Sequence, residues 1–442
     1  MNRASPINLD AHWMPYTAKR AFKAAPRMIV GAQGCYFEAD DGRQVFDSLS
    51  GLWCTGAGHG VPAIRNAIAA QLDVLDYAPS FQFGHPLSFQ LAERLGDFMP
   101  PGLNRVLFTN SGSECADTAI KIARAYWRAK GQPGKTKVIG RLRGYHGVNF
   151  GGMSVGGIGA NRKFFGPGID TDHLSATLLP ENAFAEGQPQ YGEHLAEQLV
   201  ELIALHDASN IAAVMVEPMS GSGGVVVPPQ GYLERLREIC SAHDILLIFD
   251  EVITGLGRCG ARTGSESFGV VPDMLSLAKQ LTNGVVPMGA VVCQQWVYDA
   301  FMDDGPQAAL PHGIELSHGY TYSAHPVACA AALAMLDHFE TEQLDAKVRA
   351  LQPAFASALH ALKGLPHITD IRSYGLAGAI QLAPRDGDPT ARPYYVGVRL
   401  WEAGYYVRWG GDTLQFGPPF VATDEEMASL FSAVGDAIEA EP

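Results

Sequence analysis

Two charged residues, each at the end of a short apolar run, carry the strongest chemical signal in the sequence. The apolar run 245–249 ends at Asp250, and the apolar run 275–278 ends at Lys279. Short apolar runs of this kind are typical of buried parallel strands. Because ligands of open α/β sheets bind beyond the carboxyl ends of the strands, we expect both side chains at the same edge of one sheet.

A buried amine facing a buried carboxylate across a planar ring is the arrangement that pyridoxal 5'-phosphate requires. The lysine forms a Schiff base with the cofactor aldehyde, and the carboxylate keeps the pyridine nitrogen protonated. Taken alone, Asp250 and Lys279 are more often an ordinary structural pair or part of a solvated face, since perturbed charges are frequently structural. The cofactor interpretation therefore depends on the rest of the sequence.

A phosphate site is predicted where a strand passes into a helix at 109–114. Ser111 and Glu114 have the spacing of a capping box, which marks the start of the helix. Gly112 allows close backbone approach, and the free N–H groups and the dipole of the helix start attract a phosphate, with the Ser113 hydroxyl as a further donor. An ordinary capped helix is the alternative. The sequence has no GxGxxG and no Walker lysine, so a dinucleotide or P-loop site lacks its basic parts.

Five further residues have types that suit such a site, and each has an ordinary alternative. Tyr145 and His146 lie in a glycine-flanked loop, where an aromatic ring can stack on a cofactor or simply pack. Glu217 ends the apolar run 212–216 at the same predicted edge. Thr321 lies in a hydroxyl-rich segment that fits either a phosphate or a turn. Arg408, among aromatic residues, suits a carboxylate clamp or a surface ion pair.

Composition limits the class of protein. The 442 residues are 47% hydrophobic and 18% charged, enough for a large domain with one or two smaller ones. A net charge of -14 without a basic stripe argues against nucleic acid and anionic membranes as partners. The seven cysteines are scattered without a CxxC pair, so we expect no disulfide framework, no metal site and a reducing compartment. With no apolar signal core and no apolar run of spanning length, we expect a soluble cytoplasmic protein.

Alternating strand and helix patterns predict an α/β protein with a mostly parallel sheet covered on both faces. We expect an N-terminal arm with part of a small domain at 1–60, a large domain at 61–325, and an α+β small domain at 326–442. The expected elements are a hairpin at 36–38 and 44–47, helices at 113–130, 230–243, 326–362 and 424–438, and late strands at 376–381, 405–408 and 413–416.

Together these motifs resemble the class III aminotransferases, which are fold-type I pyridoxal-phosphate enzymes with a seven-stranded sheet in the large domain. The resemblance spans nearly the whole chain and is closest to the members that use ω-amino acids and pyruvate. The segments that carry it are 9–17, 51–53, 81–86, 111–114, 144–147, 217–218, 250–258, Lys279, 320–326 and 410–417.

The resemblance implies a role for each matched position. Lys279 would hold the cofactor and Asp250 would pair with its ring nitrogen. The implied cofactor-binding residues are Gly112, Ser113, Tyr145, His146, Glu217, Asp250, Val252, Lys279 and Thr321, with Tyr145 and Val252 on the two ring faces and Thr321 supplied by a partner subunit. The implied substrate-binding residues are Trp53, Arg408 and Gln415. The family also implies a homodimer or homotetramer with active sites at the subunit interface.

The implied activity is a ping-pong transamination. An ω-amino acid such as β-alanine, or a primary amine, would give its amino group to pyruvate, leaving a semialdehyde or ketone and L-alanine. γ-Aminobutyrate, a diamine or an arylalkylamine remains open as the main donor. An aminomutase or decarboxylase would share the cofactor residues. A non-enzymatic binding protein or a pyridoxal-phosphate-dependent regulator is the alternative of another class, but a regulator needs a basic DNA-binding segment, and the sequence shows none.

Overall fold

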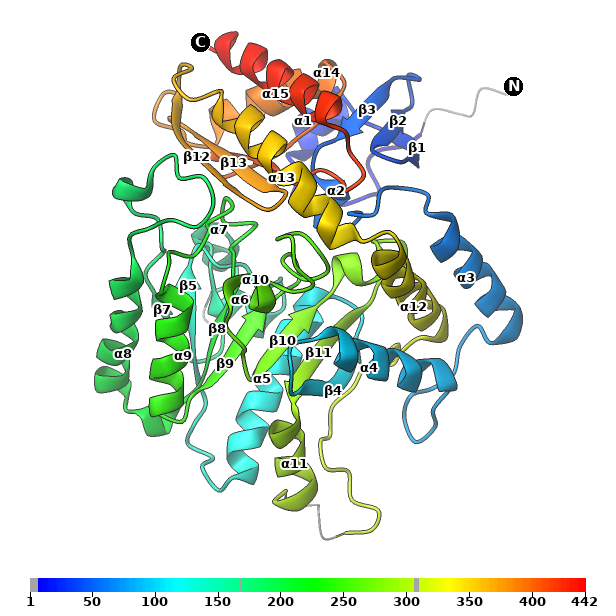
Figure 1. The fold of residues 1–442 in the computed structure, drawn as a ribbon, viewed down its shortest axis with the longest axis vertical. Helices are drawn as coiled ribbons and strands as arrows, with labels where there is room; N and C mark the ends of the chain where they lie inside the picture. Colours follow the sequence, from blue (N-terminus) through cyan, green and yellow to red (C-terminus); the bar gives the residue numbers. More distant parts are fainter. Residues whose placement is uncertain (1–6, 167, 306–309) are drawn as a thin grey trace.

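The structure is a computed structural model that describes residues 7–166, 168–305 and 310–442. Residues 1–6 lie outside the described residues. The expectation of no apolar signal core at the start of the chain falls on them. Three sheets organise the chain: a large central sheet, a small sheet near the N-terminus, and an antiparallel sheet built from the C-terminal part (Figure 1).

The central sheet has eight strands and is mostly parallel, so the predicted α/β class is confirmed. The order is β4 (Leu103–Thr109), β11 (Gly289–Gln294), β10 (Met274–Leu277), β9 (Leu246–Asp250), β8 (Ile211–Val216), β5 (Lys137–Leu142) and β6 (Gly156–Gly157), with β7 (Thr171–Leu174) also paired to β5. Among the described strands of this central sheet, β11 alone runs in the opposite direction, antiparallel to β10 and β4. The eight strands exceed the seven that the family resemblance implies. One of the eight, β6, is two glycines, for which no strand propensity gives a signal.

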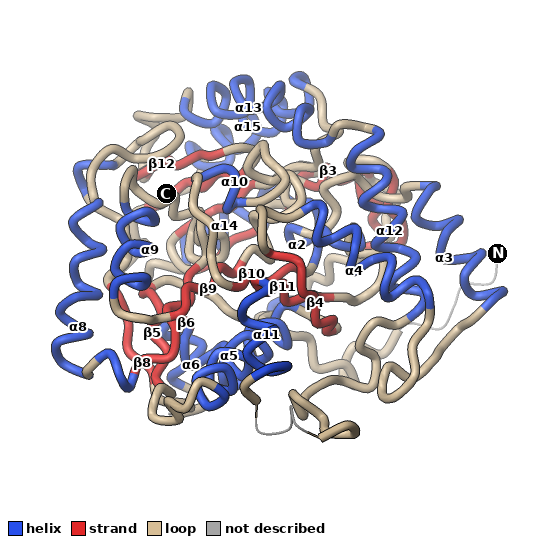
Figure 2. Tube along the Cα trace, turned by 60° about the horizontal axis from the view of Figure 1, so that its bottom comes forward, coloured by secondary structure: helices blue, strands red, loops and turns tan. Residues whose placement is uncertain are grey.

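Side chains alternate between the two faces of this sheet. On β9, Leu246 and Ile248 belong to the apolar cluster of α5 (Gly112–Ala129), whereas Leu247 and Phe249 belong to the cluster that contains α9 (Tyr232–Ala242). The first face also carries α6 (Phe150–Val155) and α11 (Gln295–Asp303), which Figure 2 shows grouped with α5 on one side of the strands. The other face is covered by α4 (Pro86–Phe98), α8 (Gln198–His206) and α12 (Pro326–Thr341). Burial on both faces explains why these strands read as continuous apolar runs.

The N-terminal and C-terminal segments meet in the small sheet. Its order is β1 (Ile29–Gln33), β2 (Tyr36–Ala39), β3 (Gln44–Asp47) and β14 (Tyr405–Tyr406). The β2–β3 hairpin occurs where the sequence predicts it, and β14 adds in parallel to β3. The C-terminal sheet contains β12 (Ile368–Tyr374), β13 (Ala377–Leu382), β16 (Thr413–Phe416) and β15 (Arg408–Gly410), packed with α13 (Leu344–His360), α14 (Ala391–Glu402) and α15 (Asp424–Glu439). The domain boundaries after residues 60 and 325 stay predictions.

The single helix expected over 326–362 is wrong, because the structure has α12 and α13 instead. Gln343 separates them with a left-handed backbone, φ 51°. Such a conformation costs about 1 kcal/mol for a residue with a side chain. Burial of Leu336 and Leu344 on either side of the break offsets this cost, and no local glycine or proline marks it.

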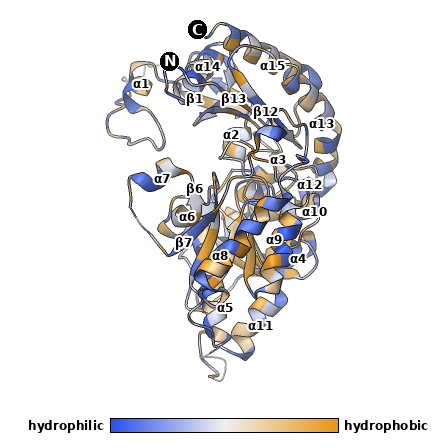
Figure 3. Ribbon diagram, turned by 90° about the vertical axis from the view of Figure 1, so that its left-hand side faces the viewer, coloured by the Kyte–Doolittle hydropathy of each residue, from blue (hydrophilic) through white to orange (hydrophobic). Residues whose placement is uncertain are grey.

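The remaining elements, short except for α3, lie between or beside the sheets. They are α1 (Lys19–Ala24), α2 (Ser50–Trp53), α3 (Pro62–Val74), α7 (Gly159–Lys163), α10 (Gly264–Phe268), η1 (Pro180–Asn182), η2 (Glu193–Glu197), η3 (Ala208–Asn210) and η4 (Lys279–Thr282). Figure 3 shows hydrophobic strands of the central sheet beside helices of mixed character. Across the described ranges, none of the helices has the length and apolar character needed to cross a membrane.

Candidate active site

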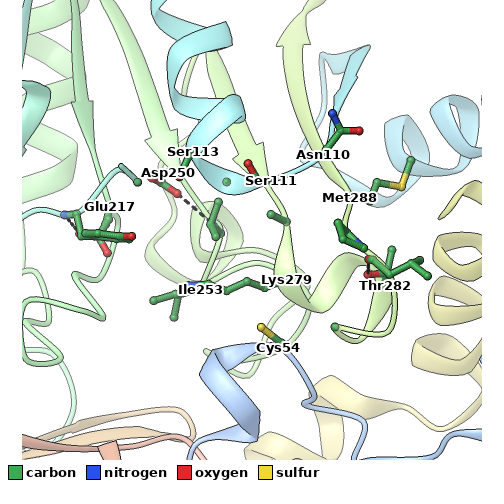
Figure 4. A pocket seen from close by; sticks show the side chains of 18 residues that line it. Cys54, Asn110, Ser111, Ser113, Glu217, Asp250, Ile253, Lys279, Thr282 and Met288 are labelled. Atoms are coloured by element: carbon green, nitrogen blue, oxygen red, sulfur yellow. Dashed lines mark hydrogen bonds between the residues drawn. The ribbon is translucent and has the colours of Figure 1, made fainter. Parts of the chain in front are cut away.

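The carboxyl ends of the parallel strands form one edge of the central sheet, and the predicted site residues gather there. Asp250 is the last residue of β9, Glu217 follows β8, and Lys279 begins η4 two residues after β10. Loops at this edge enclose a cavity of about 330 Å³ whose wall includes Asp250, Glu217, Lys279, Tyr145 and Ser113 (Figure 4). The shared edge that the sequence predicts for Asp250 and Lys279 is confirmed.

Asp250 is a buried carboxylate, only 6% exposed, with one side toward the cavity. Its Oδ2 lies 2.9 Å from His146 Nδ1, and its Oδ1 accepts a hydrogen bond from the Val252 N–H at 3.1 Å. His146 therefore lies behind the carboxylate, and its buried Nε2 has no partner among the described residues. This geometry fixes the carboxylate and leaves it able to receive a cationic ring N–H from the cavity.

Lys279 has an amine whose protonated form is disfavoured. Burial lowers the pKa of Lys279, and the charge of Arg408 lowers it further, whereas negative charge on Cys54, Asp250 and Glu217 acts in the opposite direction. The residue also has a left-handed backbone, φ 49°. Strain of that kind costs about 1–3 kcal/mol and is frequent at active sites. Lys279 thus presents to the cavity an amine with nucleophilic and basic character.

The start of α5 forms a cradle for an anion. Ser111 caps the helix by accepting a hydrogen bond from the Glu114 N–H at 3.3 Å. The predicted capping box is half formed, because the Glu114 carboxylate accepts from the backbone and side-chain N–H groups of Asn110, at 2.7 and 2.9 Å. A Cβ added to Gly112 would lie 3.1 Å from the Val252 methyl groups, so the backbone passes very close to the cavity wall. With Ser113 at the same helix start, the cradle suits a phosphate dianion.

Tyr145 and Glu217 are tied together on another wall. The Tyr145 N–H donates to Glu217 Oε1 at 2.9 Å, and the Gly221 N–H donates to Glu217 Oε2 at 3.1 Å. Burial raises the pKa of Glu217, and burial also raises the pKa of Tyr145 to about 12, with the charge of Tyr16 as the next cause. Glu217 therefore holds the Tyr145 loop. Val252 lines the cavity as well, so a planar ring between Tyr145 and Val252 stays a consistent prediction.

The residues predicted to bind substrate lie outside the wall of this cavity. Arg408 on β15 pairs in register with Gln415 on β16, is half-buried, and has no hydrogen bond or salt bridge of its guanidinium to any described residue. Gln415 is buried and donates to the Ser222 carbonyl at 3.2 Å. Trp53 is 3% exposed and packs against Gly417, where a Cβ would lie 2.2 Å from its ring. Thr321 is exposed and absent from the same cavity wall.

Reasoning from the sequence missed two residues near this site. Cys54 lines the cavity, although it was counted only among the scattered cysteines. Tyr16 lies near enough for its charge to act on Tyr145. Cys54 follows the segment 51–53 and Tyr16 lies within the segment 9–17, both of which carry the family resemblance. Neither residue has a spacing pattern that predicts a role.

These residues fit pyridoxal phosphate. The buried Asp250 carboxylate suits the ring nitrogen, the Lys279 amine with its lowered pKa suits the aldehyde, and the start of α5 suits the phosphate. The unpartnered His146 Nε2 marks a polar network that is incomplete among the described residues.

Comparison with known proteins agrees with this geometry. The class-III aminotransferase family matches residues 17–438. The chain is 61% identical over 436 residues to the β-alanine–pyruvate aminotransferase of Pseudomonas aeruginosa, covering 98% of this chain and 97% of that protein. It is 58% identical over 437 residues to the ω-amino acid–pyruvate aminotransferase of Pseudomonas putida, covering 98% and 97%. A PLP-bound amine transaminase structure from an uncultivated Pseudomonas species superposes with a TM-score of 0.90 at 35% identity, covering 98% of this chain and 99% of that one.

Proposed function

We propose that this chain, which belongs to the class-III aminotransferase family, transfers the amino group of an ω-amino acid to pyruvate with pyridoxal phosphate as cofactor. β-Alanine is the proposed main donor. The products are a semialdehyde, or a ketone from other amines, and L-alanine. The observation that carries the proposal is the presence of Lys279 and Asp250 on the wall of one cavity beside an anion-binding helix start. Identity of 61% to a β-alanine–pyruvate aminotransferase supports the choice of substrates.

The cofactor, when bound, supplies an electron sink that makes a C–H bond next to the substrate nitrogen acidic. Asp250 would stabilise positive charge at the ring nitrogen, and His146 fixes the carboxylate on the side away from the cavity. Lys279 would hold the cofactor, and its amine, when free, would move a proton from the substrate carbon. Burial lowers the pKa of Lys279 and so favours the neutral amine, the form that a base requires.

The start of α5 would hold the phosphate, with N–H groups of Gly112 and Ser113 and the Ser113 hydroxyl as donors. Ser113 Oγ already accepts from the Val148 N–H at 3.1 Å, which leaves the hydroxyl hydrogen free to donate. We assign Thr321 to the phosphate of a second subunit, because it is exposed and does not line the cavity of its own chain. The protein would then act as a homodimer or homotetramer, and size-exclusion chromatography with light scattering tests this assembly.

Arg408 is the proposed clamp for substrate carboxylates. Its guanidinium has no acidic partner within the described residues, and its charge reaches both Lys279 and Tyr145. Gln415 is its neighbour in the sheet, and Trp53 is proposed to shape the substrate side of the site. We further propose that the guanidinium swings aside when the donor has an apolar tail, with Glu217 as its alternative partner.

The test of this function is formation of alanine from β-alanine and pyruvate by the purified holoenzyme. Alanine that appears only when both substrates are present supports the proposal. Turnover of β-alanine without pyruvate would indicate a mutase or a decarboxylase instead. Faster turnover with γ-aminobutyrate, putrescine or 1-phenylethylamine would keep the aminotransferase and change the main donor. We place the enzyme in the cytoplasm, since all seven cysteines are free thiols.

A further inference from the structure

Cys54 differs from the six other cysteines, all of which lie in described parts of the chain. The other six are buried, whereas Cys54 is partly exposed and lines the cavity. Burial raises the pKa of Cys54 and of the other thiols alike, so its exposure to the cavity is what sets Cys54 apart. Cys54 is therefore the thiol that a small solute entering the substrate side of the site can meet.

The segment that carries Cys54 is pinned to the turn that carries Lys279. Gln280 Oε1 accepts a hydrogen bond from the Gly56 N–H at 2.6 Å, and Asn283 Oδ1 accepts from the Ala57 N–H at 3.0 Å. The two backbones also approach closely, because a Cβ added to Gly284 would lie 2.8 Å from Cys54 Cβ. Cys54 and Lys279 thus line one cavity from two segments that are hydrogen-bonded to each other.

The Cys54 thiol and the Lys279 amine also affect each other's pKa. Among charged groups, Cys54 has the largest effect on the pKa of Lys279, ahead of Asp250, and Lys279 has the largest effect on the pKa of Cys54. Figure 4 shows the Cys54 sulfur below the Lys279 side chain. The thiol has one weak hydrogen bond, to the Leu52 carbonyl at 3.3 Å, so rotation toward Lys279 breaks little.

We propose that Cys54 and Lys279 form a redox-sensitive pair, in which peroxide-oxidised Cys54 is captured by the Lys279 amine as a covalent S–N bond. In the first step hydrogen peroxide oxidises the thiol to a sulfenic acid and is reduced to water. In the second step the Lys279 nitrogen attacks the sulfur, the S–N bond forms, the S–O bond breaks, and the hydroxyl leaves as water with a proton from the amine. This parallels the known condensation of a sulfenic acid with a backbone nitrogen.

The pair is reactive only while the Lys279 amine is free. This condition rests on the proposed function, in which the donor amine displaces Lys279 from the cofactor. Peroxide would therefore link the pair during turnover and leave the resting enzyme at the sulfenic acid. An external thiol reverses the link: it takes the sulfur into a mixed disulfide and releases the amine, and a second thiol then restores Cys54.

The test compares holoenzyme treated with hydrogen peroxide in the presence and absence of β-alanine, without pyruvate. After digestion, mass spectrometry identifies the Cys54 and Lys279 peptides joined at a mass two hydrogen atoms below their sum. We expect this species with β-alanine, its loss after dithiothreitol, and its absence in Cys54→Ala. In Lys279→Ala, which lacks the amine, we expect a Cys54 sulfenic acid that dimedone traps. The six buried cysteines, unreactive until unfolding, are the internal control.

Two results would overturn the proposal. One is a Cys54 sulfenic acid that accumulates with β-alanine as it does in Lys279→Ala, without any joined peptide. The other is oxidation of buried cysteines while Cys54 stays reduced. The visible absorbance of the same samples separates this failure from that of the proposed function: if β-alanine leaves the absorbance unchanged, the donor is wrong. Enzyme stripped of cofactor then supplies the free amine, and the joined peptide is sought there.

Discussion

The guanidinium of Arg258 lies 5.4 Å from the centre of the Trp53 ring, with Phe420 at 4.6 Å as a second aromatic contact. Arg258 is 2% exposed and donates to carbonyl and hydroxyl groups of three segments: Leu376 O at 3.0 Å, Pro418 O at 2.8 Å and Ser50 Oγ at 2.9 Å. Burial lowers its pKa. A cation from the loop after β9 therefore fixes a tryptophan from the N-terminal segment against the C-terminal part.

Replacing Arg258 should loosen this junction. Arg258→Met keeps most of the volume but leaves buried acceptors without donors, which costs about 1–3 kcal/mol for each group left unsatisfied. We expect a lower midpoint temperature of thermal unfolding and a shift in the wavelength of tryptophan fluorescence emission. Arg258→Lys is the matched control for charge; it cannot form the same fork of hydrogen bonds and should rescue only in part. An unchanged midpoint in Arg258→Met would show that the junction does not depend on this side chain.

Removing the charge of Asp250 should disable the site without unfolding it. Asp250→Asn keeps the shape but cannot stabilise a cationic ring nitrogen, so we expect kcat/KM to fall by roughly a hundredfold or more. Loss of the negative charge should also shift the visible band of the bound cofactor. Steady-state kinetics and absorbance measure both effects, and circular dichroism controls for folding. Asp250→Asn with ordinary activity would contradict the assigned role.

The lowered pKa of Lys279 predicts how cofactor capture depends on pH. A neutral amine is the reactive form, so the rate at which cofactor-free protein binds pyridoxal phosphate rises with pH and levels off above the pKa of Lys279. Because burial moves this pKa down, the plateau should begin clearly below about 10.4, the ordinary value for lysine. Stopped-flow absorbance measures the rate. A rise that continues to pH 10.4 would mean that the amine is not perturbed.

The proposed clamp predicts a selective loss of function in Arg408→Ala. Substrates with a carboxylate, β-alanine and pyruvate, should lose roughly tenfold to a hundredfold in kcat/KM, the value of a charged hydrogen-bonded pair. The half-reaction with 1-phenylethylamine should change little, since this donor has no carboxylate. Single-turnover kinetics isolate each half-reaction. Equal losses for pyruvate and 1-phenylethylamine would contradict the swinging clamp.

The sequence was sufficient to predict those elements that a local pattern of residues marks. Apolar runs that end in Asp250 and Lys279 predicted two buried strands and one shared edge, because burial on both faces leaves a continuous apolar signal. The class-III resemblance, based on ordered motifs, is confirmed by the family match over residues 17–438.

Features set by tertiary contacts escaped the same reasoning. The left-handed Gln343 that divides α12 from α13 is enforced by packing and not by its residue type. Helix α14, which contains Pro393 and Gly397, has too little local helix propensity to be predicted. The burial of Trp53 against Gly417 and the capture of the Glu114 carboxylate by Asn110 join groups whose relation no residue spacing shows in advance.

The central claim is that Lys279 and Asp250 operate a cofactor that alternates between an amine donor and pyruvate. The most direct test is the absorption spectrum of the purified holoenzyme, first alone, then with β-alanine, then with pyruvate added. We predict a visible band that bleaches with β-alanine and returns with pyruvate, and no such cycle in Lys279→Ala. A protein that shows no visible band after incubation with pyridoxal phosphate would contradict the account.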